Sequence, residues 1–416
     1  MTSIRIIDEP CGSGKTTGLI KELKQIRDDP SKKGPVIIVV PFLDEIERYQ
    51  KELGKDWLPE PVSENGGKKI DALIELLKKG SNVITTHALY ERFRLFEHLL
   101  ASYDVIIDEV PTVVKQLPVY FGDGLRLHLL NHKQYITIDP STNIIKSTDH
   151  WQVDKQVYES GDDLHIKDFM DTVEIMDVSY VELVFYVVTV PDTFFTKPKS
   201  VTILTFLFEG TQLHHWLLKQ GFQFQHFWDS NELAQFKADM NKNLYVRNIT
   251  KPLKLKTGFT NMTDKKGKIR IQVATWAKNN LKVLRKFDPN FRMDQVLVAS
   301  HKNAWYGDEE NKFSVVSNKS SLKTRSGLGK AQHTTLITRG TNRFKHLDAL
   351  FLLGKVNMHP SLKKYLGMNT QKAADRHTLT ELVQLIYRTA IRDDYPIYLL
   401  TPDQENIRIL KEFLNS

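Results

Sequence analysis

The sequence has 416 residues, of which 41% are hydrophobic and 26% charged, and this composition excludes collagen, coiled-coil and low-complexity chains. We find no apolar run of about 18 residues and no signal-peptide pattern at the N-terminus, so we expect a cytoplasmic protein with no membrane partner. The single cysteine, Cys11, fits a reducing compartment. A chain of this length has room for two or three domains.

The net charge of +8 is concentrated in one part of the chain. Residues 241–302 contain 15 lysines and arginines against three aspartates, so this stretch carries +12 and the remainder about −4. Such a stretch suits a polyanion, because each neutralised phosphate releases counterions. A solvated lysine-rich face is an equally good explanation of the charge alone.

A phosphate-binding loop is predicted near the N-terminus. The apolar segment from Ile4 to Ile7 leads into Asp-Glu-Pro-Cys-Gly-Ser-Gly-Lys-Thr-Thr at residues 8–17, and apolar residues then recur at helical spacing. Glycines let backbone N–H groups surround phosphate oxygens, the lysine reaches the terminal phosphates, and the first threonine ligates Mg²⁺. Glu9 is unusual, because this pattern commonly starts with Gly or Ala. We predict that ATP and Mg²⁺ are bound by Gly12, Ser13, Gly14, Lys15, Thr16 and Thr17.

Further along, continuous apolar runs alternate with helical patterns, which indicates a parallel sheet covered on both faces. The run from Val105 to Ile107 ends in Asp108 and Glu109, and open α/β sheets bind ligands at the carboxyl ends of their strands. We predict that Asp108 holds Mg²⁺ together with Thr16. We predict that Glu109 orients and deprotonates the water that attacks the γ-phosphate.

A second chemical pattern lies near the C-terminus. Thr378 and Glu381 have the spacing of a capping box that opens a helix, and Gln384, Arg388 and Arg392 follow at intervals of four residues. In one helix these three side chains would share a stripe.

Taken together, these motifs resemble the helicase-like ATPases of superfamilies one and two, in particular the compact DNA helicases encoded by bacteriophages. The resemblance implies an α/β fold with two RecA-like P-loop domains containing parallel sheets, and it places the chain in the host cytoplasm if a phage encodes it. It also implies that Gln384, Arg388 and Arg392 are catalytic and that the arginines act as fingers on ATP bound to the first domain. The sequence leaves open which arginine is the principal finger.

The same resemblance suggests contacts with nucleic acid. The candidates follow predicted strands, where hydroxyl groups and backbone amides can hold phosphates without reading sequence. They are Pro41, Phe42, Thr86, His87, Arg339 and Thr341.

We expect the first RecA-like domain at residues 1–225, with an insertion at about 112–199, and the second at residues 226–416 with the arginine-finger helix. The insertion should contain β structure, including residues 135–138. We expect residues 268–275 to form the first strand of the second domain.

These features favour an ATP-dependent translocase or helicase that acts on single-stranded or forked DNA in replication, recombination or repair, with replication or recombination proteins as further partners. One alternative is a nucleic-acid binding or loading protein that uses ATP only as a switch. Another is a small-molecule P-loop kinase, although such kinases keep their arginines in a nearby lid.

Overall fold

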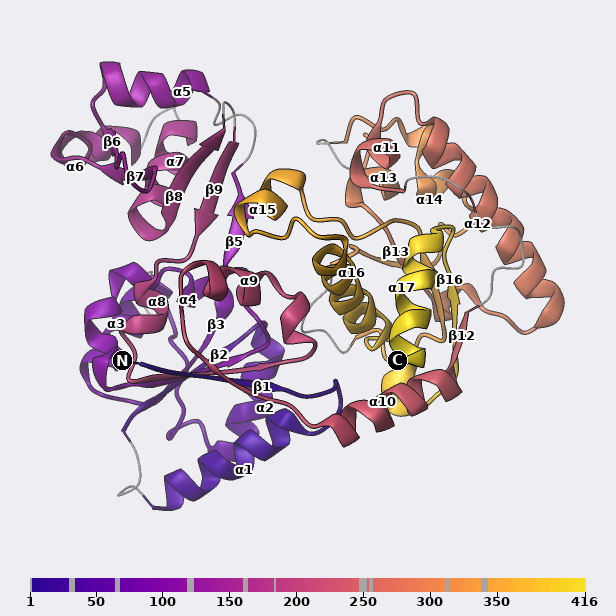
Figure 1. The fold of residues 1–416 in the computed structure, drawn as a ribbon, viewed down its shortest axis with the longest axis horizontal. Helices are drawn as coiled ribbons and strands as arrows, with labels where there is room; N and C mark the ends of the chain where they lie inside the picture. The colour runs from indigo at the N-terminus through magenta and orange to yellow at the C-terminus, as the bar shows by residue number, and fades with distance from the viewer. Residues whose placement is uncertain are drawn as a thin grey trace.

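A computed structural model describes residues 2–29, 34–63, 68–117, 123–159, 164–182, 185–246, 253, 257–310, 314–337 and 343–416. Within these residues the chain is an α/β protein with two parallel sheets and a smaller antiparallel sheet. The parallel sheets lie side by side, and the antiparallel sheet lies beyond one edge of the first domain (Figure 1). The expected architecture, two parallel-sheet domains with an insertion in the first, is therefore confirmed.

The first parallel sheet has the strand order β11-β1-β10-β4-β2-β3. Its strands are β1 (Ser3–Asp8), β2 (Val36–Val40), β3 (Val83–Thr86), β4 (Asp104–Asp108), β10 (Ser200–Thr205) and β11 (Gln225–Phe227). Along β2, Ile37 and Val39 pack into one apolar cluster and Ile38 and Val40 into another, because successive side chains of a strand point to opposite faces. Both faces are buried, which explains why these strands are continuously apolar in sequence.

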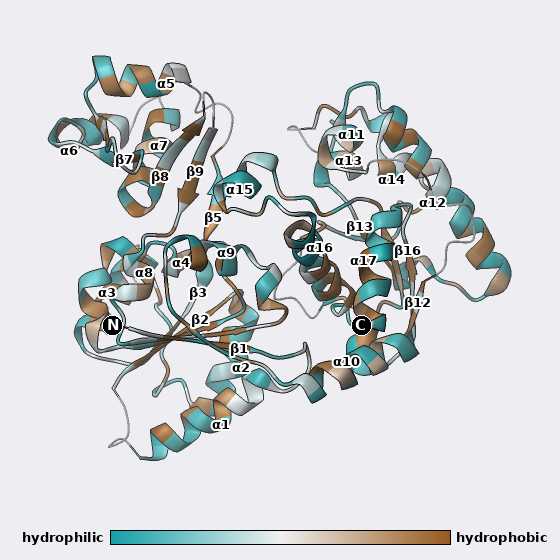
Figure 2. Cartoon of the chain, in the orientation of Figure 1, coloured by the Kyte–Doolittle hydropathy of each residue, from teal (hydrophilic) through white to brown (hydrophobic). Residues whose placement is uncertain are grey.

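Helices and short 3₁₀ turns cover this sheet. They are α1 (Lys15–Asp28), α2 (Leu43–Leu53), α3 (Lys69–Lys78), α4 (His87–Tyr90), η1 (Phe93–Leu95), η2 (Glu97–Ser102), α8 (Thr193–Thr196), η5 (Phe208–Gly210) and α9 (Gln212–Lys219). Figure 2 shows apolar residues along the central strands and hydrophilic residues on the outward sides of the surrounding helices. In the described ranges, no helix is both long enough and apolar enough to span a bilayer.

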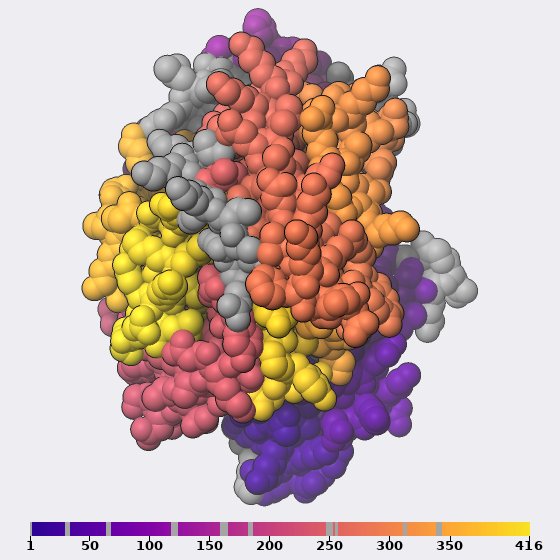
Figure 3. All heavy atoms as spheres, turned by 90° about the vertical axis from the view of Figure 1, so that its right-hand side faces the viewer, coloured from indigo at the N-terminus to yellow at the C-terminus, as the bar shows by residue number. Residues whose placement is uncertain are grey.

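The second parallel sheet has the order β12-β16-β15-β13-β14. Its strands are β12 (Leu244–Val246), β13 (Val296–Ala299), β14 (Gln332–Thr334), β15 (Ala349–Leu352) and β16 (Ile397–Leu400). The surrounding elements are α10 (Ser230–Asn243), α11 (Phe259–Thr263), α12 (Lys268–Phe287), η6 (Met293–Gln295), α13 (Lys302–Trp305), η7 (Asn318–Ser320), α14 (Leu322–Arg325), α15 (Pro360–Tyr365), α16 (Gln371–Ile386), η8 (Ala390–Asp393) and α17 (Gln404–Asn415). Figure 3 shows α10 (pink) against α17 (yellow) beneath α12, and Phe236 of α10 shares an apolar cluster with Leu410 of α17.

The expected strand at residues 268–275 is wrong, because the whole segment belongs to α12. Ile269, Ile271 and Val273 alternate with polar residues as in a strand. The residues that the helix buries nevertheless follow a helical period: Val273, Ala274, Ala277, Leu281 and Leu284. The edge strand of this domain is instead β12, which pairs in parallel with β16.

The insertion forms the antiparallel sheet, in the order β5-β9-β8-β7-β6. Its elements are β5 (Val114–Gln116), α5 (Asp123–Leu127), the π-helical turn η3 (His128–His132), β6 (Ile136–Ile138), β7 (Ile144–Ser147), α6 (Asp149–Asp154), η4 (Lys155–Glu159), α7 (Leu164–Ile175), β8 (Asp177–Glu182) and β9 (Phe185–Thr189). Its buried Trp151 and Phe169 share one apolar cluster with the first sheet and with Leu362 of α15. The insertion therefore packs against elements of both domains.

Candidate functional site

The predicted phosphate-binding loop connects β1 to α1. Gly12 and Gly14 have φ angles of 87° and 96°, in the left-handed region that glycine adopts without steric cost. Lys15 donates from Nζ to the backbone oxygens of Glu9, at 2.5 Å, and Pro10, at 2.7 Å. Among the described residues α1 has no side-chain cap, so an anion in the loop could accept hydrogen bonds from the first-turn N–H groups.

The unusual Glu9 is accommodated by its neighbours. Its backbone N–H donates to the oxygen of Thr205 at 3.1 Å, and its carboxylate accepts a hydrogen bond from the Ser13 hydroxyl at 3.1 Å. The exposed Ser13 hydroxyl is thus turned toward Glu9. The Ser13 backbone N–H donates to the oxygen of Pro10 at 3.2 Å.

The two predicted carboxylates end β4 beside this loop. Asp108 is buried, and its Oδ2 accepts hydrogen bonds from Thr16, at 3.3 Å, and from Tyr49, at 2.9 Å. Burial raises the pKa of Asp108 to about 6, and the adjacent negative charge of Glu109 adds to this increase. Glu109 has a φ of 66°, a left-handed conformation that is uncommon for a residue other than glycine.

Two residues near Asp108 make contacts that the sequence did not predict. Tyr49 lies on the buried face of α2, and no sequence motif identified it as a partner of Asp108. The helical spacing of Ile46, Tyr49 and Leu53 could have predicted its burial but not its contact. His87, predicted to touch nucleic acid, places Nε2 3.1 Å from the backbone oxygen of Asp108.

The second domain supplies a positive side chain to these carboxylates. Arg388 is 7% exposed and forms an ion pair from Nη2 to Oε1 of Glu109 at 2.5 Å. Gln384 donates to the backbone oxygen of Phe206 over 3.5 Å. Tyr387 lies over the loop, because a side-chain Cβ at Gly12 would meet its hydroxyl at 3.2 Å.

The structure corrects the helix expected around these residues. Thr378 and Glu381 do not open it, since α16 begins at Gln371 with Thr370 as its cap. The Thr378 hydroxyl instead donates to the backbone oxygen of Val356. The helix ends at Ile386, so Arg388 and Arg392 lie beyond it, with Arg392 in η8. The stripe expected on one continuous helix is therefore wrong.

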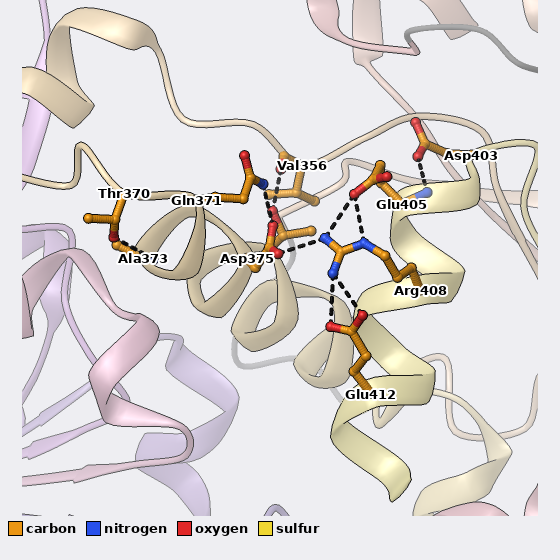
Figure 4. Close-up of polar contacts among 10 residues, drawn as sticks. Val356, Thr370, Gln371, Ala373, Asp375, Asp403, Glu405, Arg408 and Glu412 are labelled. Atoms are coloured by element: carbon orange, nitrogen blue, oxygen red, sulfur yellow. Dashed lines mark hydrogen bonds and ion pairs between the residues drawn. The ribbon is translucent and has the colours of Figure 1, made fainter. Parts of the chain in front are cut away.

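Helix α16 is anchored on two sides. On one side, Arg408 of α17 contacts Asp375 of α16 as well as Glu405 and Glu412 of its own helix, as Figure 4 shows. On the other side, α16 contacts the turn that follows β10. Thr380 donates to the backbone oxygen of Leu207 at 3.1 Å, and Nδ1 of His377 lies 3.0 Å from the oxygen of Gly210.

A cavity of about 200 Å³ separates the loop from the second domain. Its lining combines predicted residues from both domains: Gly12, Gly14, Lys15, Thr16, Thr17, Asp108, Glu109, Gln384, Arg388 and Arg392. Arg48 of α2 and Cys11 also contribute to the wall. The predicted catalytic and nucleotide-binding residues are thus brought together, apart from the outward-turned Ser13 side chain.

This cavity fits a hard divalent cation. Two neighbouring carboxylates and the Thr16 hydroxyl supply oxygen donors, and the raised pKa of Asp108 reflects buried negative charge that a cation would compensate. No cluster of three or more potential His, Cys, Asp or Glu ligands occurs among the described residues. Mg²⁺ suits such a site, because it uses one or two carboxylates together with substrate phosphates.

Those predicted nucleic-acid contacts that the structure describes do not line the cavity. Pro41 and Phe42 follow β2, and Phe42 is 45% exposed. Thr86 ends β3. Arg339 and Thr341 lie outside the described residues.

A larger groove of about 1070 Å³ follows the carboxyl ends of the second sheet, and the sequence did not single it out. Its lining includes Lys302, Lys355 and Lys363. Burial, and then the charge of Lys355, lowers the pKa of Lys363. The groove thus places three lysines, together with Asp403 and Glu405, beside the insertion, which contributes Gln116.

Comparison with known proteins gives a family model and several remote relatives. Residues 237–414 match the YonV C-terminal Rossmann-like domain. The whole chain is 23% identical to the SPbeta prophage-derived uncharacterized protein YonV of Bacillus subtilis (strain 168), over 100% of both sequences. Among solved structures, an XPD helicase has a TM-score of 0.48 at 12% identity, covering 100% of this chain and 95% of the other. Xpd4 of S. tokodaii has a TM-score of 0.47 at 15% identity, covering 100% and 94%.

Proposed function

We propose that this protein is a Mg²⁺-dependent ATPase that translocates on nucleic acid, with DNA as the substrate, and unwinds or remodels it. The observation that carries the proposal is the cavity between the domains, where Lys15, the Asp108–Glu109 pair and Arg388 meet. An ATPase that does mechanical work needs such an arrangement, because opposite sides of the nucleotide must contact parts that move relative to each other.

In this proposal the loop and Lys15 bind the phosphates, with backbone amides of residues 12–17 as the remaining donors. Thr16 and Asp108 hold Mg²⁺, which supplies charge neutralisation to the β- and γ-phosphates when it is bound. Glu109 accepts the proton of the attacking water, and Gln384 lines the cavity beside it. These residues all belong to elements that end at the same edge of the first sheet or at the helix facing it.

The contact between Arg388 and Glu109 couples nucleotide binding to the proposed general base, Glu109. While Arg388 is paired with Glu109, its guanidinium neutralises that carboxylate rather than a phosphate. A γ-phosphate in the cavity offers Arg388 a second anionic partner. Transfer of Arg388 to that phosphate releases the Glu109 carboxylate from its ion pair and neutralises the charge that develops during hydrolysis.

Nucleic acid would follow the carboxyl ends of both sheets. Pro41, Phe42, Thr86, His87, Arg339 and Thr341 stay as proposed contacts, and the groove lined by Lys302, Lys355 and Lys363 extends this surface in the second domain. Lysines suit a track that grips phosphates without reading bases. The prophage origin of the relative from Bacillus subtilis supports a role in phage replication, recombination or repair in the host cytoplasm.

The test is steady-state ATP hydrolysis with single-stranded DNA of increasing length, duplex DNA and RNA. The Lys15→Ala variant serves as the blank. Turnover that rises with strand length to a plateau is the expected result for a translocase. Stimulation that is independent of length would indicate an ATP-dependent switch, and indifference to every nucleic acid would contradict the proposal.

A further inference from the structure

Tyr49 connects helix α2 to the carboxylate at the centre of the cavity. Its side chain is 0% exposed and packs in the apolar cluster that contains Leu19, Ile38 and Val40. From this position its hydroxyl donates to Oδ2 of Asp108 at 2.9 Å, which is shorter than the 3.3 Å contact from Thr16. Tyr49 is thus the closer of the two side-chain donors that hold this carboxylate oxygen.

Packing alone does not explain the hydroxyl. A phenylalanine would fill nearly the same space without the cost of burying a polar group. The Tyr49 hydroxyl is the donor in this contact, because an ionised carboxylate can only accept a hydrogen bond. The contact therefore fixes one oxygen of Asp108 and directs the other away from Tyr49.

The N-terminal end of α2 lies at the molecular surface. Phe42 caps α2 and Leu43 opens it, and these side chains are 45% and 58% exposed. At about 1.5 Å per residue, Tyr49 lies roughly 10 Å along the helix from Phe42. Between them, Glu45 and Arg48 pair at 3.4 Å, and Arg48 lines the cavity. A displacement of this rigid helix at its exposed end would therefore move Tyr49 against Asp108.

We propose that Tyr49 is a positioning residue that holds Asp108 in the orientation required by a divalent cation, and that α2 transmits contact at Phe42 and Leu43 to this metal site. The inference rests on the proposed function. It adds a residue that does not line the cavity. Partners that orient metal-ligating carboxylates commonly change metal affinity about 10–100-fold when they are removed.

The first experiment measures Mn²⁺ binding by electron paramagnetic resonance in the presence of a non-hydrolysable ATP analogue, so that turnover plays no part. Tyr49→Phe should weaken Mn²⁺ binding about tenfold. Tyr103→Phe is the matched control, because its buried hydroxyl donates to the backbone oxygens of Leu77 and Ser81 at the opposite end of β4. The control should bind Mn²⁺ as the wild type does.

The outcomes separate the two proposals. If the wild type shows no nucleotide-dependent Mn²⁺ binding, the proposed function fails and this inference fails with it. If the wild type binds and Tyr49→Phe binds equally well, only the inference is overturned. An equal loss of Mn²⁺ binding in Tyr49→Phe and Tyr103→Phe would also overturn the inference, since the effect would then come from general damage to the domain.

A second experiment measures ATP turnover against Mg²⁺ concentration, with and without single-stranded DNA. Tyr49→Phe should raise the half-saturating Mg²⁺ concentration about tenfold, with nearly normal kcat at saturating Mg²⁺. DNA should lower the half-saturating concentration for the wild type but not for this variant. A loss of kcat without a change in Mg²⁺ dependence would contradict a positioning role, and an equal effect of DNA on both proteins would contradict transmission through α2.

Discussion

Arg388 and Arg392 line the same cavity, but their environments differ. Arg388 is 7% exposed and pairs with Glu109, whereas Arg392 lies beyond it in a 3₁₀ turn. We expect Arg388→Ala to lower ATP hydrolysis about 10³-fold or more, because a finger arginine acts on charge that develops in the transition state. ATP binding should change by only a few-fold.

Arg392→Ala should have a smaller effect on hydrolysis, and single-turnover assays with fluorescent nucleotide titrations would measure both quantities. Arg292 pairs with Asp294 on the surface, so Arg292→Ala is a control for the loss of an arginine. A larger loss of hydrolysis in Arg392→Ala than in Arg388→Ala would reverse the assignment of the principal finger.

His333 makes the stability of the second domain sensitive to acid. Its ring stacks on Trp305 with centroids 4.9 Å apart, and burial lowers its pKa to about 3. The unfolded chain, with a usual histidine pKa near 6.5, binds more protons than the folded chain between these two values, so stability is full above about pH 6.5 and falls as the pH decreases. At pH 5 the loss should be about 1–2 kcal/mol.

His333→Gln should reduce this dependence on pH, even if it lowers stability at pH 7. Urea unfolding of the wild type and the variant from pH 7.5 to pH 5 measures the difference, and His150→Gln, at an exposed position, is the control. Parallel pH profiles for the wild type and His333→Gln would contradict the prediction.

At the scale of elements, the local sequence pattern was sufficient to predict a strand or a loop where one interaction dominates. Continuous apolar runs predicted strands such as β2 and β4, and the glycine-rich loop predicted the junction of β1 and α1. The local pattern predicted the wrong element where tertiary contacts determine the structure. Residues 268–275 alternate like a strand, but Gly267 and the apolar positions after Val273 extend a helix through them. Likewise α16 ends at Ile386, and the Ala390 N–H then pairs with the backbone oxygen of Leu347, which precedes β15; no spacing of arginines reveals this.

Gly210 allows α16 to approach the turn after β10. A Cβ at this position would lie 2.1 Å from Oγ1 of Thr380 and 2.4 Å from the backbone oxygen of Arg376. Because one of these atoms belongs to the backbone, Gly210→Ala should push the helix away and move Arg388 from Glu109. We expect at least a tenfold loss of ATP hydrolysis, with nucleotide binding largely retained.

Small-angle scattering should show a larger radius of gyration for Gly210→Ala than for the wild type. Gly124→Ala is the control, since nothing lies within 4 Å of a Cβ there. An alanine variant at position 210 with normal turnover would mean that the contact between α16 and the turn does not set the geometry of the cavity.

At the scale of the whole molecule, the sequence predicted which residues would meet but not the surface that joins them. The sequence predicted that Lys15, Asp108 and Arg388 lie close together, because each belongs to a recognisable motif. The groove beside the insertion could not be predicted in this way, because Lys302 follows β13 whereas Lys355 and Lys363 follow β15. Their proximity depends on strand order, which local pattern does not encode.

The proposed function leaves two lysine-containing surfaces as candidates for the nucleic-acid track. Neutralising Lys302, Lys355 and Lys363 to glutamine should weaken binding of single-stranded DNA and reduce the slope of log affinity against log salt by about 2, because each lost phosphate contact contributes about 0.7. The matched control neutralises Lys278, Lys282 and Lys286, which share the exposed face of α12 and lie in the basic stretch of residues 241–302. Fluorescence anisotropy at several salt concentrations measures both slopes. If the groove forms the track, only the first variant loses slope for every DNA sequence. If the control loses slope instead, the phosphates bind along α12 and the groove is not the track.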